Sequence, residues 1–200
     1  MYLIDKLNDY EIILGSGSPR RKELLSEMGI DFRVEVRTGE EVFPEDLEIE
    51  EIAGFLSQQK SELFVSDIQK NQLVITADTI VVADNRILGK PTDIEDAKAM
   101  LRFLSGKGHR VITGVTLLTS EKSHTFSVST EVVFKELSEE EIDYYVTHFK
   151  PFDKAGAYGI QEWIGHVAIE GIRGSYFNVM GLPTHRLWEE VSEFVEVTSD

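Results

Sequence analysis

The chain has 200 residues, and its 36 acidic and 20 basic side chains give a formal net charge of −16 at pH 7. Such a charge argues against nucleic-acid polymers and anionic membranes as partners. The absence of cysteine excludes disulfides, thiol catalysis and cysteine-ligated zinc. No apolar run approaches the roughly 20 residues of a membrane span, and no signal-peptide pattern opens the chain, so we expect a cytoplasmic protein. The length suits one α/β domain over residues 1–200, or two lobes that share a cleft.

The first patterned stretch combines a strand, a turn and a helix. Residues 11–14 predict a short strand and residues 22–28 a helix, while Ser18 and Pro19 suit an N-cap and the first helical position. Such a turn presents unpaired backbone N–H groups, which bind anions. A dinucleotide fingerprint is excluded because Arg20 stands where its third glycine would be.

Two arginines make this turn a candidate functional site. Arg20 and Arg21 lie at the positive end of the helix dipole, where each costs about 0.3–1 kcal/mol. A bound phosphate would reverse the sign of that penalty. We therefore favour a phosphate site here over a solvated basic turn.

The next helix follows an acidic loop. Residues 32–36 predict a strand, and residues 38–46 form a loop containing Glu41, for which simple solvation is the alternative to catalysis. Residues 48–65 predict a helix with an apolar stripe. Lys60 lies within that stripe, so its ammonium either reaches solvent or points into an anion pocket, and both readings stay open.

A single carboxylate interrupts the most apolar run of the chain. Residues 73–83 predict a strand buried on both faces, and Asp78 lies in its middle. Because desolvating a charge is costly, Asp78 needs a metal, a cation or a role in proton transfer, and we favour function. A turn at residues 84–86 leads to Gly89-Lys90-Pro91, which is not a P-loop because proline follows the lysine.

Most of the remaining predicted helices and strands have a structural role. They are a helix with a capping box of Thr92 and Glu95 that ends at Gly106, strands at residues 109–118 and 125–134, a helix with a capping box of Ser138 and Glu141, a strand at 163–170, a turn at 171–174, and a helix after Pro183. His124, His148, His166 and His185 lack the spacing of metal ligands.

The stretch from residue 150 to 161 is the second unusual one. Gly156 and Gly159 allow the backbone to approach a ligand closely. Tyr158 can pack or stack, and the Gln161 amide offers the donor and the acceptor needed to read a base edge. A ligand site and a purely steric glycine loop are equally favoured by these residues alone.

Taken together, these stretches resemble the Maf family of nucleoside triphosphate pyrophosphatases, from about residue 12 to residue 188. The matching motifs are Ser16-x-Ser18-Pro19-Arg20-Arg21, Lys60, Ala77-Asp78-Thr79, Gly89-Lys90-Pro91, Leu104-Ser105-Gly106, the run DKAGAYGIQ at residues 153–161, Gly174-Ser175-Tyr176, and VMGLP at residues 179–183. Arg20 directly after Pro19, Thr79 after Asp78, and Gln161 at the end of its run resemble the branch that acts on dTTP and UTP rather than on 7-methyl-GTP.

The resemblance implies an α/β fold with a mixed twisted sheet in two lobes, flanked by helices, with the active-site cleft between the lobes. It also implies hydrolysis of dTTP and UTP to the nucleoside monophosphate and pyrophosphate, a divalent metal (Mg²⁺ or Mn²⁺), and usually a homodimer. The alternatives are a non-catalytic nucleotide-binding regulator of cell division and a Rossmann-type oxidoreductase, the latter weakened by the missing glycine.

The resemblance further implies a role for each motif residue. Asp78 is the catalytic proton acceptor and Glu41 joins it at the metal. Base specificity falls to Arg20, Thr79 and Gln161, and phosphate binding to Ser16, Ser18, Arg21, Lys60 and Lys90.

Overall fold

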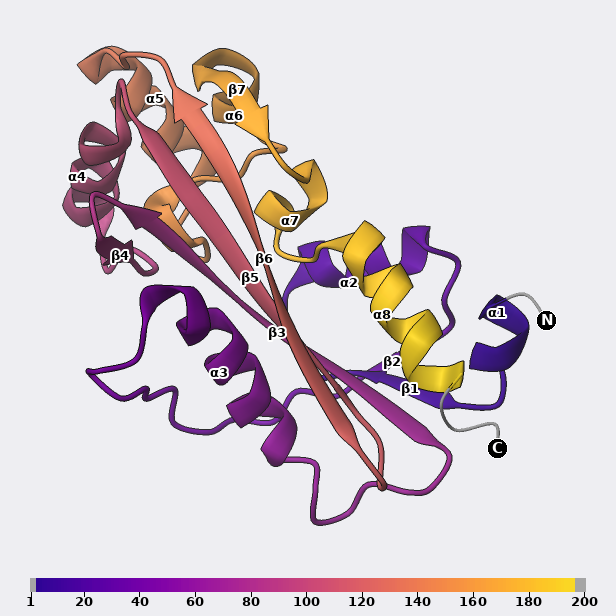
Figure 1. Ribbon diagram of the computed structural model, residues 1–200. Coiled ribbons are helices and arrows are strands. Elements are labelled where there is room, and N and C mark those ends of the chain that lie inside the picture. Colours follow the sequence, from indigo (N-terminus) through magenta and orange to yellow (C-terminus); the bar gives the residue numbers. More distant parts are fainter. Residues whose placement is uncertain (1–2, 197–200) are drawn as a thin grey trace. The chain divides into compact units, whose positions relative to one another are not determined.

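A computed structural model describes residues 3–196 (Figure 1). Its strands are β1 Glu11–Leu14, β2 Arg33–Val34, β3 Gln72–Ala83, β4 Arg86–Leu88, β5 Gly108–Leu118, β6 Ser123–Phe134 and β7 Ile169–Arg173. Its helices are α1 Leu3–Leu7, α2 Pro19–Glu27, α3 Ile49–Glu62, α4 Ile94–Leu104, α5 Glu139–Phe149, the 3₁₀ helix η1 Ala155–Ala157, α6 Trp163–Ala168, α7 Tyr176–Met180 and α8 Thr184–Glu196. Within residues 3–196, none of the helices has the length and apolar character needed to cross a bilayer.

The strands of the described residues form one mixed sheet. Their order is β2-β1-β3-β5-β6-β7, and β4 pairs separately with β3. β1 runs parallel to β2 and to β3, whereas the β3–β4 and β6–β7 pairs are antiparallel. The predicted class, α/β with a mixed sheet flanked by helices, is confirmed.

The chain divides into two compact units. Unit 1 comprises Met1–Asp78, Thr113–Val128 and Gly181–Asp200, and unit 2 comprises Thr79–Ile112 and Ser129–Met180. The strands β3, β5 and β6 each contribute residues to both units. The single domain over residues 1–200 and the cleft between lobes stay predictions.

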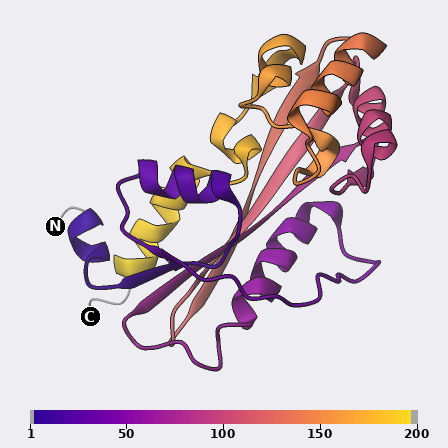
Figure 2. The same cartoon turned by 180° about the vertical axis from the view of Figure 1, so that it is seen from behind.

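In unit 1, helix α3 rests directly on the backbone of β5. A Cβ atom on Gly114 of β5 would lie 2.2 Å from the carbonyl carbon of Ala53 in α3. The Ser57 hydroxyl of α3 lies 2.8 Å from the Thr116 hydroxyl of β5, and the Thr76 hydroxyl of β3 donates to the Ser57 carbonyl. These contacts fix α3, which carries Lys60. At the other end of the unit, α1 packs against α8 (Figure 2).

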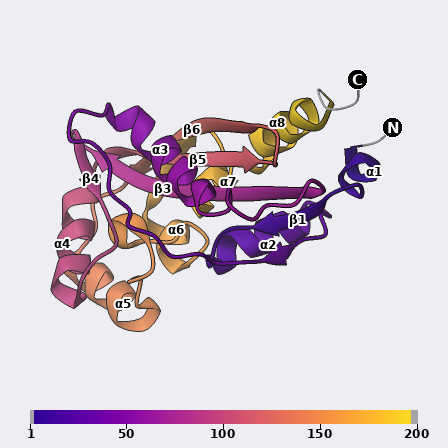
Figure 3. The ribbon, with the colours of Figure 1, turned by 90° about the horizontal axis from the view of Figure 1, so that it is seen from below.

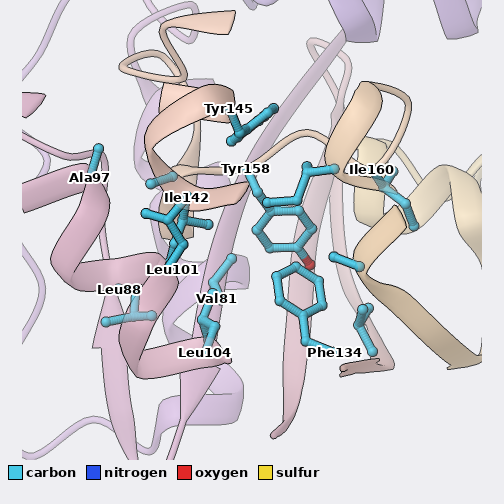
Figure 4. Close-up of a cluster of buried hydrophobic side chains, with 14 of the residues drawn as sticks. Val81, Leu88, Ala97, Leu101, Leu104, Phe134, Ile142, Tyr145, Tyr158 and Ile160 are labelled. Atoms are coloured by element: carbon cyan, nitrogen blue, oxygen red, sulfur yellow. The ribbon is translucent and has the colours of Figure 1, made fainter. Parts of the chain in front are cut away.

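The core of unit 2 is aromatic and aliphatic. Helices α4 and α5 lie side by side (Figure 3), and their buried faces meet side chains from β3 and β6. Figure 4 shows Tyr158 beside Phe134 in this cluster, with ring centroids 4.9 Å apart. The alternatives for Tyr158 therefore resolve in favour of packing within the protein.

The capping box predicted at Thr92 and Glu95 is wrong. The N-cap of α4 is Asp93, whose carboxylate accepts a hydrogen bond of 2.9 Å from the backbone N–H of Asp96. Aspartate caps a helix as well as threonine does, and here the helix begins one residue later than the threonine pattern required. The second predicted capping box, of Ser138 and Glu141, is confirmed.

The strand predicted at residues 163–170 and the turn at 171–174 are also wrong, because α6 occupies the first part and β7 the second. Ile164 and Ala168 are both buried and lie four residues apart, a helical spacing that the β-branched composition masked. A Cβ on Gly165 would lie 1.7 Å from the Ile160 carbonyl oxygen, so α6 packs tightly against that residue. The short helices α1 and α7 were not predicted.

We expect the substitution Gly114→Ala to lower the free energy of unfolding by about 3 kcal/mol or to prevent folding, because its methyl group has no space against the α3 backbone. The control is Gly171→Ala on β7, where no atom lies within 4 Å of an added Cβ and the change should stay within about 0.5 kcal/mol. Urea denaturation measures both. Equal effects at the two positions would contradict the close packing of α3 on β5.

Candidate active site

The turn before α2 has the predicted local structure. Ser18 is the N-cap, its hydroxyl accepts a hydrogen bond from the Arg21 backbone N–H, and Pro19 opens the helix. Ser16 is buried, and its hydroxyl accepts from the Ser18 N–H at 3.3 Å. Arg20 is half-buried on the first helical turn, and that turn contains no acidic side chain. The turn therefore concentrates positive charge.

The Arg21 guanidinium ties together three separate stretches of unit 1. Its Nε donates to the Gly181 carbonyl at 2.8 Å, and its Nη1 donates to the Ala77 carbonyl at 2.7 Å and to the Ser16 hydroxyl at 3.1 Å. Burial lowers the pKa of Arg21, and the nearby Asp78 carboxylate opposes that shift. Arginine stays charged even so. Its contact with Ala77 fixes the backbone of the residue that precedes Asp78, a role that the sequence did not predict.

The side chains of Asp78, Lys60 and Glu41 form an ion-paired group. The Lys60 ammonium donates a short hydrogen bond to the Asp78 carboxylate and lies 3.1 Å from a Glu41 oxygen. The Asp78 side chain is 14% exposed and the Lys60 side chain 22%, while Glu41 is 57% exposed. Of the two readings of Lys60, the structure favours the inward one. Asp78 has the cationic partner that its place in an apolar strand requires.

The acidic loop is also held to α3 beside this group. The Gln59 side-chain amide donates to the Val42 carbonyl at 3.0 Å. Gln59 and Val42 are the sequence neighbours of Lys60 and Glu41, which form the adjacent ion pair. Two adjacent contacts therefore fix the position of Glu41 in a loop without regular secondary structure.

Two carboxylates are available to a metal ion at this group. Among residues 3–196, no cluster of three or more histidine, aspartate or glutamate side chains is placed to hold a metal. Mg²⁺ is typically bound by one or two protein carboxylates, with substrate phosphates and waters completing its coordination. Asp78 and Glu41 fit a metal of that kind, whose remaining ligands come from outside the protein.

In unit 2, the backbone joins the two glycine-containing motifs. The Gly156 N–H donates to the Gly89 carbonyl at 3.0 Å, so the residue before Lys90 is paired with the second motif. Gly156 has a φ of +69°, and a Cβ there would meet the Val81 side chain at 3.1 Å. Lys90 itself is exposed, and Thr79 is half-buried in β3.

Gln161 has a side-chain atom without a hydrogen-bond partner among the described residues, as do Gln59 and His109. Its side-chain oxygen is buried and has no hydrogen-bond partner among the described residues. Such an orphan acceptor costs about 1–3 kcal/mol. Its inaccessible position means that a base meets it only after the side chain moves. The role of Gln161 in base reading therefore stays a prediction.

Each predicted site residue therefore has a place in one unit. Unit 1 holds Ser16, Ser18, Arg20, Arg21, Glu41, Lys60 and Asp78, and unit 2 holds Thr79, Lys90 and Gln161. The observed contacts join Ser16 to Arg21, and Lys60 to both Asp78 and Glu41. Gln59 was not predicted as a site residue, because it belongs to none of the motifs. Its contact with the Val42 carbonyl is seen only in the structure.

A histidine and a tyrosine form a buried pair in the core of unit 2. His109 Nε2 lies 2.7 Å from the Tyr158 hydroxyl, and the His109 ring packs edge-on against Phe134. Burial lowers the pKa of His109 to about 4 and raises the pKa of the Tyr158 hydroxyl. His109 is thus neutral at pH 7 and anchors the start of the loop that leads to Gln161.

The chain is similar to known proteins over almost its whole length. The sequence model of a family described as Maf-like protein matches residues 11–194. A Phocaeicola vulgatus protein named dTTP/UTP pyrophosphatase is 52% identical over 96% of this chain and 100% of its own length. Proteins of the same name from Christiangramia forsetii and Porphyromonas gingivalis are 50% and 48% identical, covering 96% and 97% of this chain and 98% and 99% of their own lengths.

We expect acid to destabilise the protein through His109. The unfolded chain binds this proton with a pKa near 6.5 and the folded chain with a pKa of about 4, so stability falls as the pH drops through that window. Between pH 7 and pH 5 the loss from His109 is about 2 kcal/mol.

The measurement is the free energy of unfolding from urea titrations at several pH values, for the wild type and for His109→Gln. The variant should lose less stability on acidification than the wild type does. Identical pH slopes for the two proteins would contradict a neutral, buried His109.

Proposed function

Since the chain belongs to the Maf family, we propose that it hydrolyses dTTP and UTP to the nucleoside monophosphate and pyrophosphate. The observation that carries the proposal is the Asp78 carboxylate, held in β3 and paired with the Lys60 ammonium. The full-length relatives named for this activity support the choice of substrate. A non-catalytic regulator is not favoured, because the full-length relatives are named for an enzymatic activity.

The reaction breaks the α–β phosphoanhydride bond by addition of water. In phosphoryl transfer the negative charge spreads over the phosphoryl oxygens, so positioning and charge stabilisation dominate catalysis. We assign Asp78 to accept the proton of the attacking water, and Arg20 and Lys60 to stabilise the charge on the phosphates. Ser16 and Ser18 belong to the same phosphate site through the turn before α2.

The Arg21 guanidinium serves this site by positioning. It binds the Ala77 and Gly181 carbonyls and the Ser16 hydroxyl, so it orients the phosphate turn and the strand that carries Asp78. This role adds to the phosphate binding that the resemblance implies for Arg21.

A divalent cation, Mg²⁺ or Mn²⁺, is part of the proposal. Asp78 and Glu41 would hold it, since carboxylate oxygens suit such hard ions. When bound, the ion neutralises phosphate charge and makes the attacking water more acidic. The Lys60 ammonium, which pairs with both carboxylates, offsets one of their two negative charges when no ion is bound.

The remaining site residues are assigned to base selection and to phosphate binding. Gln161 reads the base with support from Thr79 and Arg20, and Lys90 binds phosphate. Uracil and thymine present carbonyl acceptors beside one N–H donor, and a side-chain amide can answer both. Among the described residues, no protein donor holds the Gln161 oxygen, so the assignment requires no protein hydrogen bond to be broken. A homodimeric state and a cytoplasmic location complete the proposal.

We expect Asp78→Asn to lower kcat by about 10²–10⁴-fold while nucleotide binding survives, because the swap keeps the shape and removes the base. Pyrophosphate release from dTTP and UTP with Mg²⁺ measures turnover, and calorimetry measures binding. The matched control is Asp84→Asn, an exposed carboxylate on the turn after β3 that lies 2.8 Å from the Lys107 ammonium. If Asp78→Asn retains more than about a tenth of the wild-type kcat, the role of Asp78 fails.

We expect Gln161→Glu to reduce discrimination among bases while leaving the phosphate chemistry intact, because it places acceptors against base carbonyls. The measurement is kcat/KM for dTTP, UTP, CTP, GTP and ATP. In the wild type, kcat/KM for dTTP and UTP should differ by no more than roughly 200-fold, since their bases differ by one methyl group. A wild-type preference for GTP, or an unchanged ranking in the variant, would remove Gln161 from base reading.

A further inference from the structure

A buried group of polar side chains surrounds the turn that carries Gln161. The turn runs from Gly159 to Glu162 and is closed by a hydrogen bond of 3.0 Å from the Glu162 N–H to the Gly159 carbonyl. Ile160 and Gln161 are its two central residues. Their backbone conformation is therefore set by what holds the two ends of the turn.

One hydroxyl group holds both ends. The Tyr145 hydroxyl of α5 accepts a hydrogen bond of 3.0 Å from the Gly159 N–H and donates a short one to the Glu162 carboxylate. Tyr145 is fully buried, and Figure 4 shows it beside Tyr158. Burial, and then the Glu162 contact, raises the pKa of Tyr145, so this hydroxyl stays a neutral donor.

Lys154 pairs with the same Glu162 carboxylate. The Lys154 ammonium lies 2.9 Å from the second Glu162 oxygen, and its side chain is only 9% exposed. A Cβ on Gly159 would lie 2.9 Å from Lys154 Cε and 3.0 Å from Glu162 Cδ, so this ion pair packs directly on the glycine. The turn has little room to shift.

We propose that Tyr145 and Glu162 are positioning residues that set base selectivity by holding the turn beneath Gln161. The inference rests on the proposed function of Gln161. A site that hydrogen-bonds its substrate rejects a wrong partner strongly, but only while its groups keep their geometry. A displacement of about 1 Å can cost about 100-fold in rate, and the Tyr145 hydroxyl restrains both neighbours of the Ile160–Gln161 pair.

The decisive variant is Tyr145→Phe, which removes one oxygen and keeps the ring that stacks on Phe149. We expect kcat/KM for UTP to fall about tenfold, mainly through KM, with less than a twofold change for CTP. The matched control is Tyr144→Phe on the same helix. Tyr144 is 44% exposed, and its ring makes the aromatic contacts with His148 and Trp163. The UTP/CTP ratio of this variant should equal that of the wild type.

Two further variants separate positioning from folding. In a Gln161→Ala background, Tyr145→Phe should change the UTP/CTP ratio no further, because Tyr145 acts through Gln161. Glu162→Gln keeps an acceptor for the Tyr145 hydroxyl but loses the charge that faces Lys154, so it should retain more selectivity than Glu162→Ala. This comparison also tests the proposal if Tyr145→Phe does not fold.

A lowered melting temperature with an unchanged UTP/CTP ratio in Tyr145→Phe would overturn the proposal, as would equal losses for both nucleotides. Calorimetric affinities for UTP and CTP give the same ratio without turnover. If the wild type releases no pyrophosphate, the proposed function fails, while the affinity ratio still decides whether Tyr145 controls selectivity.

Discussion

The arrangement of unit 1 depends on the contacts of one guanidinium. Arg21 binds carbonyl and hydroxyl oxygens from the turn before α2, from β3 and from the segment before α8, which are far apart in the sequence. A buried arginine with planar donors suits this task, because its charge persists and its several N–H groups have fixed directions. The dipole penalty at the start of α2 is therefore offset by interactions that a neutral residue could not make.

The charge distribution is compatible with the proposed phosphate site on an acidic protein. The chain carries a net charge of −16, yet the first turn of α2 contains Arg20 and Arg21 and no acidic residue. Lys60 pairs with both Asp78 and Glu41, which lowers the repulsion between the two carboxylates. Nearby charges dominate at such distances, since salt screens contributions from farther than about 10 Å.

The sequence predicted those parts of the fold whose signals are local. The cap at Ser18, the buried strand around Asp78 and the capping box at Ser138 each depend on neighbouring residues, and each is observed. The strand prediction for residues 163–168 was wrong. The β-branched residues there favour a strand, but packing against Ile160 selects the helix α6. The Arg21 contacts and the Gln59 contact join distant segments, so no local pattern could have predicted them.

Both units hold a proposed functional side chain through its neighbours. Arg21 binds the carbonyl of Ala77, the residue before Asp78, and Tyr145 binds the N–H of Gly159, two residues before Gln161. A contact to the backbone fixes the direction of a side chain without occupying the atoms that meet a ligand. That separation matters most for Gln161, whose orphan oxygen would lose its capacity to accept from a base if a protein donor held it directly. On the proposed assignment, Tyr145 therefore acts on selectivity while Gln161 keeps its own polar atoms for the base.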